Sequence, residues 1–147
     1  MNLNLRVNGR LVDVDVEPDT MLVDVLRDEV GLTGPRTTCG VGLCGTCTVL
    51  LDGEPVSSCI LMAPLALGRE ITTVEGLPED DPVVACFDKH HAFQCGFCIP
   101  GMVLTARDMV DQGRATSREE IREGLGGNLC RCGCYVKIIE AIEEAAT

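Results

Sequence analysis

The sequence predicts an α+β chain in which a β-rich first half is followed by a helical second half. Apolar and polar residues alternate with period two only before about residue 75, and apolar residues at helical spacing follow. The cysteines, ten among 147 residues, form two groups, one in each half. A chain of this length accommodates one domain or two small ones.

Composition excludes several classes of function. Lys and Arg number 12 against 23 Asp and Glu, and the net charge of −11 argues against binding nucleic acid or an anionic membrane surface. No apolar run approaches the ~18 residues that span a bilayer. Met1 opens directly into alternating residues without an export signal, so we expect a cytoplasmic protein. In a reducing compartment, many cysteines more often bind metal than form disulfides.

The first elements read as a hairpin followed by a helix. Strands are expected at residues 3–7 and 12–16, because both alternate and because Asn8-Gly9 between them is a strong signal for a type I′ turn. A helix is expected from Pro18, with its apolar face at every third or fourth residue, and Gly31 ends it.

The rest of the first half predicts a long loop and three short strands. Residues 33–47 are rich in Gly, Thr, Pro and Cys, and loops of this length in compact domains are usually functional. Strands are expected at Thr48–Leu51, Pro55–Cys59 and Ile71–Val74, the first two joined by a turn at Asp52-Gly53.

The polar, proline-containing stretch 75–82 predicts a domain boundary, which gives domains 1–76 and 77–147. Helical signals follow this stretch, among them a proline at a first helical position and a capping-box pattern at Ser117. Helices are therefore expected over residues 83–91, from Pro100 to Gly113, after Ser117, and from about Tyr135.

The first cysteine group has the spacing Cys39-x4-Cys44-x2-Cys47, followed by Cys59. This spacing is the plant-type ferredoxin arrangement for a [2Fe–2S] cluster. Interspersed glycines let backbone amides approach the sulfur atoms and offset their negative charge. Buried structural cysteines or a zinc site are the alternatives, but a zinc ribbon needs a second C-x2-C that this half lacks.

The second group joins Cys95-x2-Cys98 to Cys130-x-Cys132, thirty-one residues further on. Its spacing alone allows either zinc or an iron–sulfur cluster. The C-x-C half is uncommon for tetrahedral zinc, whose paired ligands are usually two to four residues apart. The spacing therefore favours iron–sulfur without deciding the question.

Longer motifs around these cysteines are recognisable. Gln-Cys-Gly-Phe-Cys-Ile-Pro-Gly at 94–101, Gly-Gly-Asn-Leu-Cys-Arg-Cys at 126–132 and Tyr135 resemble the small iron–sulfur subunit of the molybdenum hydroxylases. That family includes xanthine dehydrogenase, aldehyde oxidoreductase and aerobic carbon monoxide dehydrogenase. The loop 39–47 and the following Leu-Leu-Asp-Gly are also similar to theirs, so the resemblance covers essentially the whole chain.

The resemblance implies a β-grasp ferredoxin-like domain followed by a four-helix bundle, each holding one [2Fe–2S] cluster. Carried over by motif, the first cluster's ligands are Cys39, Cys44, Cys47 and Cys59, and the second's are Cys95, Cys98, Cys130 and Cys132. In the family the second cluster lies nearest the molybdenum cofactor. Gln94 and the sulfur of Cys132 are therefore expected to contact the pterin.

The implied function is electron transfer within a larger complex. A large partner would hold the molybdopterin-type cofactor and a medium partner FAD, as a dimer of heterotrimers, with single electrons passing between them through the two clusters. The direction of flow and the substrate stay open, among carbon monoxide, aldehydes, purines, N-heteroaromatics and aromatic CoA thioesters. The alternative is a free-standing ferredoxin, which would need only the first domain.

Some cysteines and motifs fall outside this assignment. Cys134 is an extra thiol next to the second ligand set, and ligation through it stays an alternative, although Cys130 and Cys132 keep the motif's register. We expect Cys86 to be a small buried hydrophobic residue.

Two other patterns suggest different sites. His90 and His91 suggest Rieske-type ligation, but each histidine would need a motif with a cysteine, so we expect a solvated pair at a helix end. Residues 40–45 satisfy G-x-G-x-x-G, but the neighbouring cysteines argue against a nucleotide site.

Overall fold

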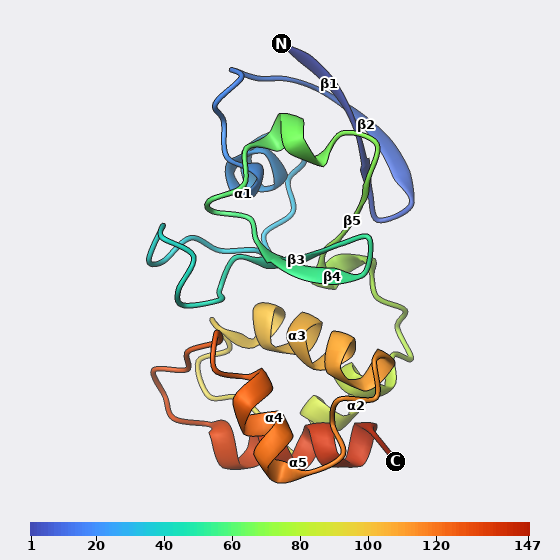
Figure 1. Ribbon diagram of the computed structural model, residues 1–147, viewed down its shortest axis with the longest axis vertical. Helices are drawn as coiled ribbons and strands as arrows, with labels where there is room; N and C mark the ends of the chain where they lie inside the picture. The colour runs from blue at the N-terminus through green and yellow to red at the C-terminus, as the bar shows by residue number, and fades with distance from the viewer.

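The computed structural model describes residues 1–147, and it stacks a sheet-containing half on a helical half (Figure 1). The N-terminus lies at one end of the long axis and the C-terminus at the other. The α+β class, with a ferredoxin-like first half and a helical second half, is thereby confirmed. None of the helices combines the length and apolar character that a membrane crossing requires.

The first half is built on a five-stranded sheet of order β2-β1-β5-β3-β4. The strands are β1 (Asn2–Val7), β2 (Arg10–Asp15), β3 (Thr48–Leu51), β4 (Glu54–Ser57) and β5 (Glu70–Thr72). Only the β1–β5 pair is parallel. Alternate residues of β1 are buried, as the period-two pattern predicts, and Asn8 and Gly9 adopt the positive φ angles of 51° and 76° that a type I′ turn requires.

The helix of this half is shorter than the sequence predicts. The α-helix α1 covers only Leu22–Asp24 and continues as a π-helical segment, η1 (Val25–Glu29). The residues after Pro18 pair with a distant segment instead. Met21 forms a β-bridge with Met62, and the N–H of Ala63 donates to the carbonyl of Thr20 at 2.9 Å. Tertiary pairing therefore delays the start of the helix.

Two predicted strands are also too long. β4 ends at Ser57, so Cys59 lies in the turn beyond the strand rather than on it. β5 ends at Thr72, and Val74–Gly76 forms a 3-10 turn, η3. A further 3-10 turn, η2, covers Ala63–Ala66. The apolar side chains of α1, η1 and the sheet form one buried core, of which Leu5, Leu22, Leu26 and Ile71 are fully buried.

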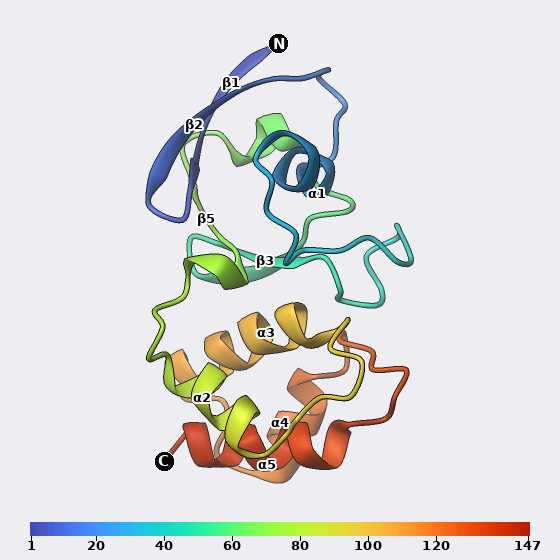
Figure 2. The ribbon, with the colours of Figure 1, turned by 180° about the vertical axis from the view of Figure 1, so that it is seen from behind.

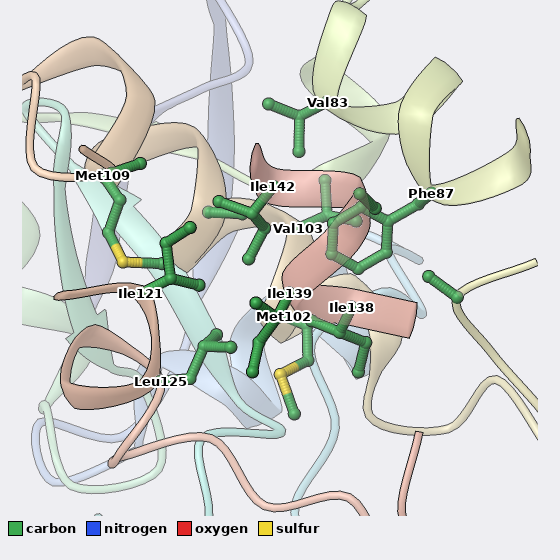
Figure 3. Close-up of a cluster of buried hydrophobic side chains, with 14 of the residues drawn as sticks. Val83, Phe87, Met102, Val103, Met109, Ile121, Leu125, Ile138, Ile139 and Ile142 are labelled. Atoms are coloured by element: carbon green, nitrogen blue, oxygen red, sulfur yellow. The ribbon is translucent and has the colours of Figure 1, made fainter. Parts of the chain in front are cut away.

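The second half contains α2 (Pro82–Lys89), α3 (Ile99–Asp111), α4 (Arg118–Gly124) and α5 (Tyr135–Ala145), close to the predicted ranges. Their apolar faces meet in a second core around Met102, Ile138 and Ile142 (Figure 3). The Ser117 hydroxyl caps α4 by accepting from the N–H of Glu120 at 3.2 Å. Only half of the capping box forms, because the Glu120 carboxylate accepts from Thr116.

The two halves pack through α3, which lies directly against the β3–β4 edge of the sheet in both views (Figures 1 and 2). The connecting segment is anchored to the first half. The Asn8 side chain bonds to Thr73, and Glu75 accepts from the N–H of Gly34 at 2.6 Å. The cysteine-bearing loops of both halves lie on the same side of the molecule.

Candidate iron–sulfur sites

Three cysteines of the first group, Cys39, Cys44 and Cys47, lie on an irregular loop without helix or strand, as the sequence predicts for residues 33–47. The backbone N–H groups of Val41, Leu43 and Cys44 each donate to the Cys39 sulfur at 3.4 Å. These donors, that of Val41 foremost, lower the pKa of the Cys39 thiol to about 6. The loop therefore stabilises a thiolate, which is the form that binds metal.

The other three thiols of this group, those of Cys44, Cys47 and Cys59, are buried. Burial, together with the adjacent Cys47 thiol, raises the pKa of Cys59 to about 11. The turn that carries Cys59 is tied to the loop, because the Ser58 hydroxyl and N–H both donate to the carbonyl of Cys47, at 2.5 and 3.4 Å. In the apo-protein this thiol stays protonated, and a metal would have to displace its proton.

One glycine of the loop is fixed by a neighbouring backbone. Gly45 has a φ of +75°, and a Cβ there would lie 2.3 Å from the carbonyl oxygen of Gly127 in the second half. The close approach of the loop to this segment therefore requires a residue without a side chain.

The second group is assembled from two distant segments. Cys95 and Cys98 precede α3, and Cys98 is its N-cap residue, while Cys130 and Cys132 lie in the turn before α5. The N–H of Phe97 donates to the Cys95 sulfur at 3.5 Å and lowers the pKa of that thiol. Burial, aided by the neighbouring Cys130 thiol, raises the pKa of Cys98 to about 12.

A tyrosine holds the second segment in place. The Tyr135 hydroxyl accepts from the N–H of Cys130 at 2.8 Å and donates to the carbonyl of Asn128 at 3.0 Å. Cys134 lies beside Cys130, and its N–H donates to the Cys130 sulfur at 3.4 Å. Burial and the Cys130 thiol raise the pKa of the Cys134 thiol. The structure thus brings a fifth thiol close to the second group.

A mostly apolar cavity of about 400 Å³ opens between the two groups. Its lining includes Cys44 from the first group and Cys95, Cys98 and Cys130 from the second. It is bordered by cysteines from both halves of the chain.

The arrangement of the thiols suits a binuclear cluster. No three potential ligands surround one position suitable for a single metal ion. The thiols of each group lie beside one another: Cys39 beside Cys44, Cys47 beside Cys59, Cys95 beside Cys132, and Cys130 beside both Cys98 and Cys134. A [2Fe–2S] cluster takes two protein ligands on each iron, so each group offers the four neighbouring thiols that its donor set requires.

The two cysteine groups are joined by contacts that the sequence analysis did not find. The N–H of Leu129, which precedes Cys130, donates to the carbonyl of Cys44 at 2.8 Å. The buried Asn128 side chain donates to the carbonyl of Gly45 at 3.3 Å and accepts from Thr105. A Cβ on Gly101 of α3 would overlap that same Gly45 carbonyl. Only the three-dimensional packing brings these residues together.

The two predicted pterin-contact residues lie in different environments. Gln94 is exposed, immediately before Cys95. Cys132 is half-buried within the second group. The Gln94 side chain is therefore accessible to another molecule at this surface.

Other candidate residues take no part in either site. His90 is not a solvated residue as predicted, because it contacts Glu144 of α5 at 2.5 Å. His91 is exposed at the end of α2, with a φ of 49°. Cys86 is half-buried and packs against the helical core, close to the expected role. Residues 40–45 form part of the cysteine loop and are followed by β3 rather than a helix, so the G-x-G-x-x-G pattern lacks the structural context of a nucleotide site.

The fold and the two cysteine groups define a protein with two [2Fe–2S]-binding domains. Residues 5–76 match the family model described as a 2Fe-2S iron-sulfur cluster binding domain, and residues 73–143 match that of a [2Fe-2S] binding domain. The chain belongs to the family of small iron–sulfur subunits of molybdenum hydroxylases, which serve oxidoreductase complexes whose catalytic sites lie on partner subunits.

Relatives cover nearly the whole chain. The nicotinate dehydrogenase small FeS subunit of Eubacterium barkeri is 40% identical over 99% of this chain and 94% of its own length. The aldehyde oxidoreductase iron-sulfur-binding subunit PaoA of Escherichia coli K12 is 38% identical over 99% and 72%. Among solved structures, quinoline 2-oxidoreductase from Pseudomonas putida 86 matches with a TM-score of 0.94 and 46% identity, over 99% of this chain and 92% of that one.

Proposed function

We propose that this chain passes single electrons between a molybdopterin site on a large partner and FAD on a medium one. Residues 1–76 form its β-grasp ferredoxin-like domain and residues 77–147 its four-helix bundle, and each holds one [2Fe–2S] cluster. When bound, each cluster accepts and donates one electron at a time.

The proposed ligands are the four thiols of each group. Cys39, Cys44, Cys47 and Cys59 bind the first cluster, and Cys95, Cys98, Cys130 and Cys132 bind the second. The proximity of the thiols within each group supports this assignment, as do the amide donors directed at Cys39 and Cys95. Hydrogen bonds to the sulfur atoms offset the negative charge of a cluster and help to set its potential.

The observation that carries the proposal is the hydrogen bond from the Leu129 N–H to the Cys44 carbonyl, 2.8 Å long. Cys44 belongs to the first ligand set, and Leu129 is bonded covalently to Cys130 of the second. One hydrogen bond and about ten covalent bonds therefore connect the sulfur of Cys44 in one set to the sulfur of Cys130 in the other. A chain that only stored iron would not need this short connection.

Apolar surface beside each cysteine group supports docking of partners there. Val41 and Leu43 are exposed on the first cysteine loop, and Phe93, Phe97 and Leu129 are exposed around the second group. Exposed apolar groups gathered around a functional loop are typical of interaction surfaces. We assign the second surface, with Gln94 and Cys132, to the large partner with its pterin, and the first to the FAD-binding partner.

Isolation of the native protein tests the proposal. We expect it to purify in a dimer of heterotrimers containing molybdenum and FAD, with about four iron and four sulfide per copy of this chain from two clusters. A monomer with the same iron content but no partners would favour a free-standing ferredoxin. Zinc without sulfide would contradict both functions.

A further inference from the structure

Arg36 connects the two cysteine groups. It lies three residues before Cys39, and its backbone is fixed to the first cysteine loop. Its N–H donates to the carbonyl of Thr46 at 3.0 Å, and its own carbonyl accepts from the Thr46 hydroxyl at 2.9 Å. Its side chain extends to the other half of the protein, where the guanidinium donates to the carbonyls of Gly96 and Phe97 at 3.1 and 2.7 Å.

The contacted carbonyls belong to the turn between Cys95 and Cys98. The guanidinium carbon also lies 5.0 Å from the centre of the Phe97 ring, in a cation–π arrangement. All of these contacts are with neutral groups, so they leave the positive charge of Arg36 in place. That charge is permanent, because an arginine does not lose its proton in a protein.

One peptide group links this charge to a sulfur. The Gly96 carbonyl that accepts from Arg36 shares its peptide bond with the N–H of Phe97, which donates to the Cys95 sulfur at 3.5 Å. The two bonds therefore form a chain from the guanidinium through a single peptide to the sulfur. Hydrogen bonds in such chains polarise and strengthen one another.

We propose that Arg36, a residue of the first domain, is a positioning residue that raises the reduction potential of the cluster in the second domain. Reduction adds one negative charge to a cluster. A nearby cation and a strengthened amide donor to sulfur both stabilise the reduced form, so the potential rises. The inference rests on the proposed function, since it requires a cluster bound through Cys95.

The arrangement also makes this potential depend on domain packing. Arg36 reaches the second group only while the first cysteine loop lies against the turn 95–98. A protein whose halves separated would lose the charge and the polarised donor together. The higher potential is therefore a property of the assembled chain and not of the second domain alone.

Replacing Arg36 by Gln in the holoprotein tests the inference. The substitution removes the charge and turns the charge-assisted hydrogen bond to the Gly96 carbonyl into a weaker neutral one. We expect the ratio of reduced to oxidised second cluster to fall about tenfold at fixed ambient potential, a shift of about 59 mV for a one-electron couple. The measurement is a redox titration followed by EPR, with iron and sulfide content determined on the same samples.

Two further variants separate charge from structure. Arg36→Lys keeps the charge and should leave the second potential near that of the unmodified protein. Arg27→Gln is the matched control, because Arg27 donates to the carbonyls of Thr33 and Pro35 on the same loop but makes no hydrogen bond to the turn 95–98. It should leave both potentials unchanged. If Arg36→Gln does not assemble, Arg36→Met, which keeps the apolar stem, replaces it.

The outcomes are distinct. A lower potential of the second cluster alone in Arg36→Gln, with recovery in Arg36→Lys, supports the inference. An unchanged potential of the second cluster in Arg36→Gln overturns the inference, as does an equal shift in the potentials of both clusters. A shift in Arg27→Gln or in Arg36→Lys as large as that in Arg36→Gln also overturns it. Absence of two cluster signals in the unmodified protein would instead refute the proposed function, so the two failures can be told apart.

Discussion

The two cysteine groups are built differently, although we propose that they bind the same kind of cluster. The first spans residues 39–59, within one loop and the adjoining pair of strands. The second combines a turn before α3 with a turn before α5, separated in sequence by α3 and α4. The first site is therefore nearly local, whereas the second exists only when the helices are packed.

The electrostatic support of the two groups differs in the same way. Three amides of its own loop point at Cys39. In the second group, one amide points at Cys95 and one at Cys130, and the first domain adds the charge of Arg36. The amide donors of the first group therefore come from its own loop, whereas the second group also depends on a charged residue of the other domain.

The largest effect is expected from replacing a cluster ligand, which should remove one cluster and leave the other. Cys44→Ser should abolish the EPR signal of the first cluster, and Cys98→Ser that of the second, because each removes one of four ligands from an independent set. Cys86→Ser is the control and should preserve both signals, since Cys86 packs against the helical core outside both groups. Loss of both signals in either ligand variant would contradict two independent sites.

A substitution at the domain interface should have the next largest effect. In Gly101→Ala the added methyl group overlaps the Gly45 carbonyl, so α3 must move away from the first cysteine loop. Overpacking of this kind costs about 2 kcal/mol, which lowers the Tm by roughly 4–8 °C for a chain of this size.

The control for that substitution is Gly127→Ala. Its added methyl group meets nothing within 4 Å. Thermal unfolding of the two holoproteins provides the comparison. An equal Tm for both variants would show that the close approach of α3 and the loop does not matter for stability.

A smaller effect is expected from Tyr135→Phe, which deletes the hydroxyl that joins Cys130 to Asn128. Loss of such hydrogen bonds costs about 1 kcal/mol and loosens only the second ligand set. Challenge with an iron chelator should release iron from the second cluster several-fold faster and from the first at an unchanged rate. Equal acceleration at both sites would indicate general unfolding instead.

The smallest effect is expected from Cys134→Ser. The thiol lies beside Cys130, but Cys130 and Cys132 keep the register of the sequence motif and complete a set of four thiols with Cys95 and Cys98. Both EPR signals and the iron content should therefore be retained. Disappearance of the second signal would identify Cys134 as a ligand in place of Cys130 or Cys132.

The same difference between local and long-range contacts explains which features could be predicted from the sequence. Asn8-Gly9 predicted the hairpin, and cysteine spacing predicted the first group, because turn chemistry and ligand spacing act over a few residues. The start of α1 was misplaced because Met21 pairs with Met62, forty-one residues away. The bridging roles of Arg36 and Leu129 could not be predicted either, because their partners lie in the other half of the chain.

EPR of the reduced holoprotein tests the central claim most directly. If two clusters lie on either side of the Cys44–Leu129 hydrogen bond, dithionite should produce two distinguishable [2Fe–2S] signals in equal amounts. Their lines should broaden or split when both clusters are reduced, because the two spins interact at close range. A single signal, or two signals that never influence each other, would contradict a chain built to pass electrons between adjacent clusters.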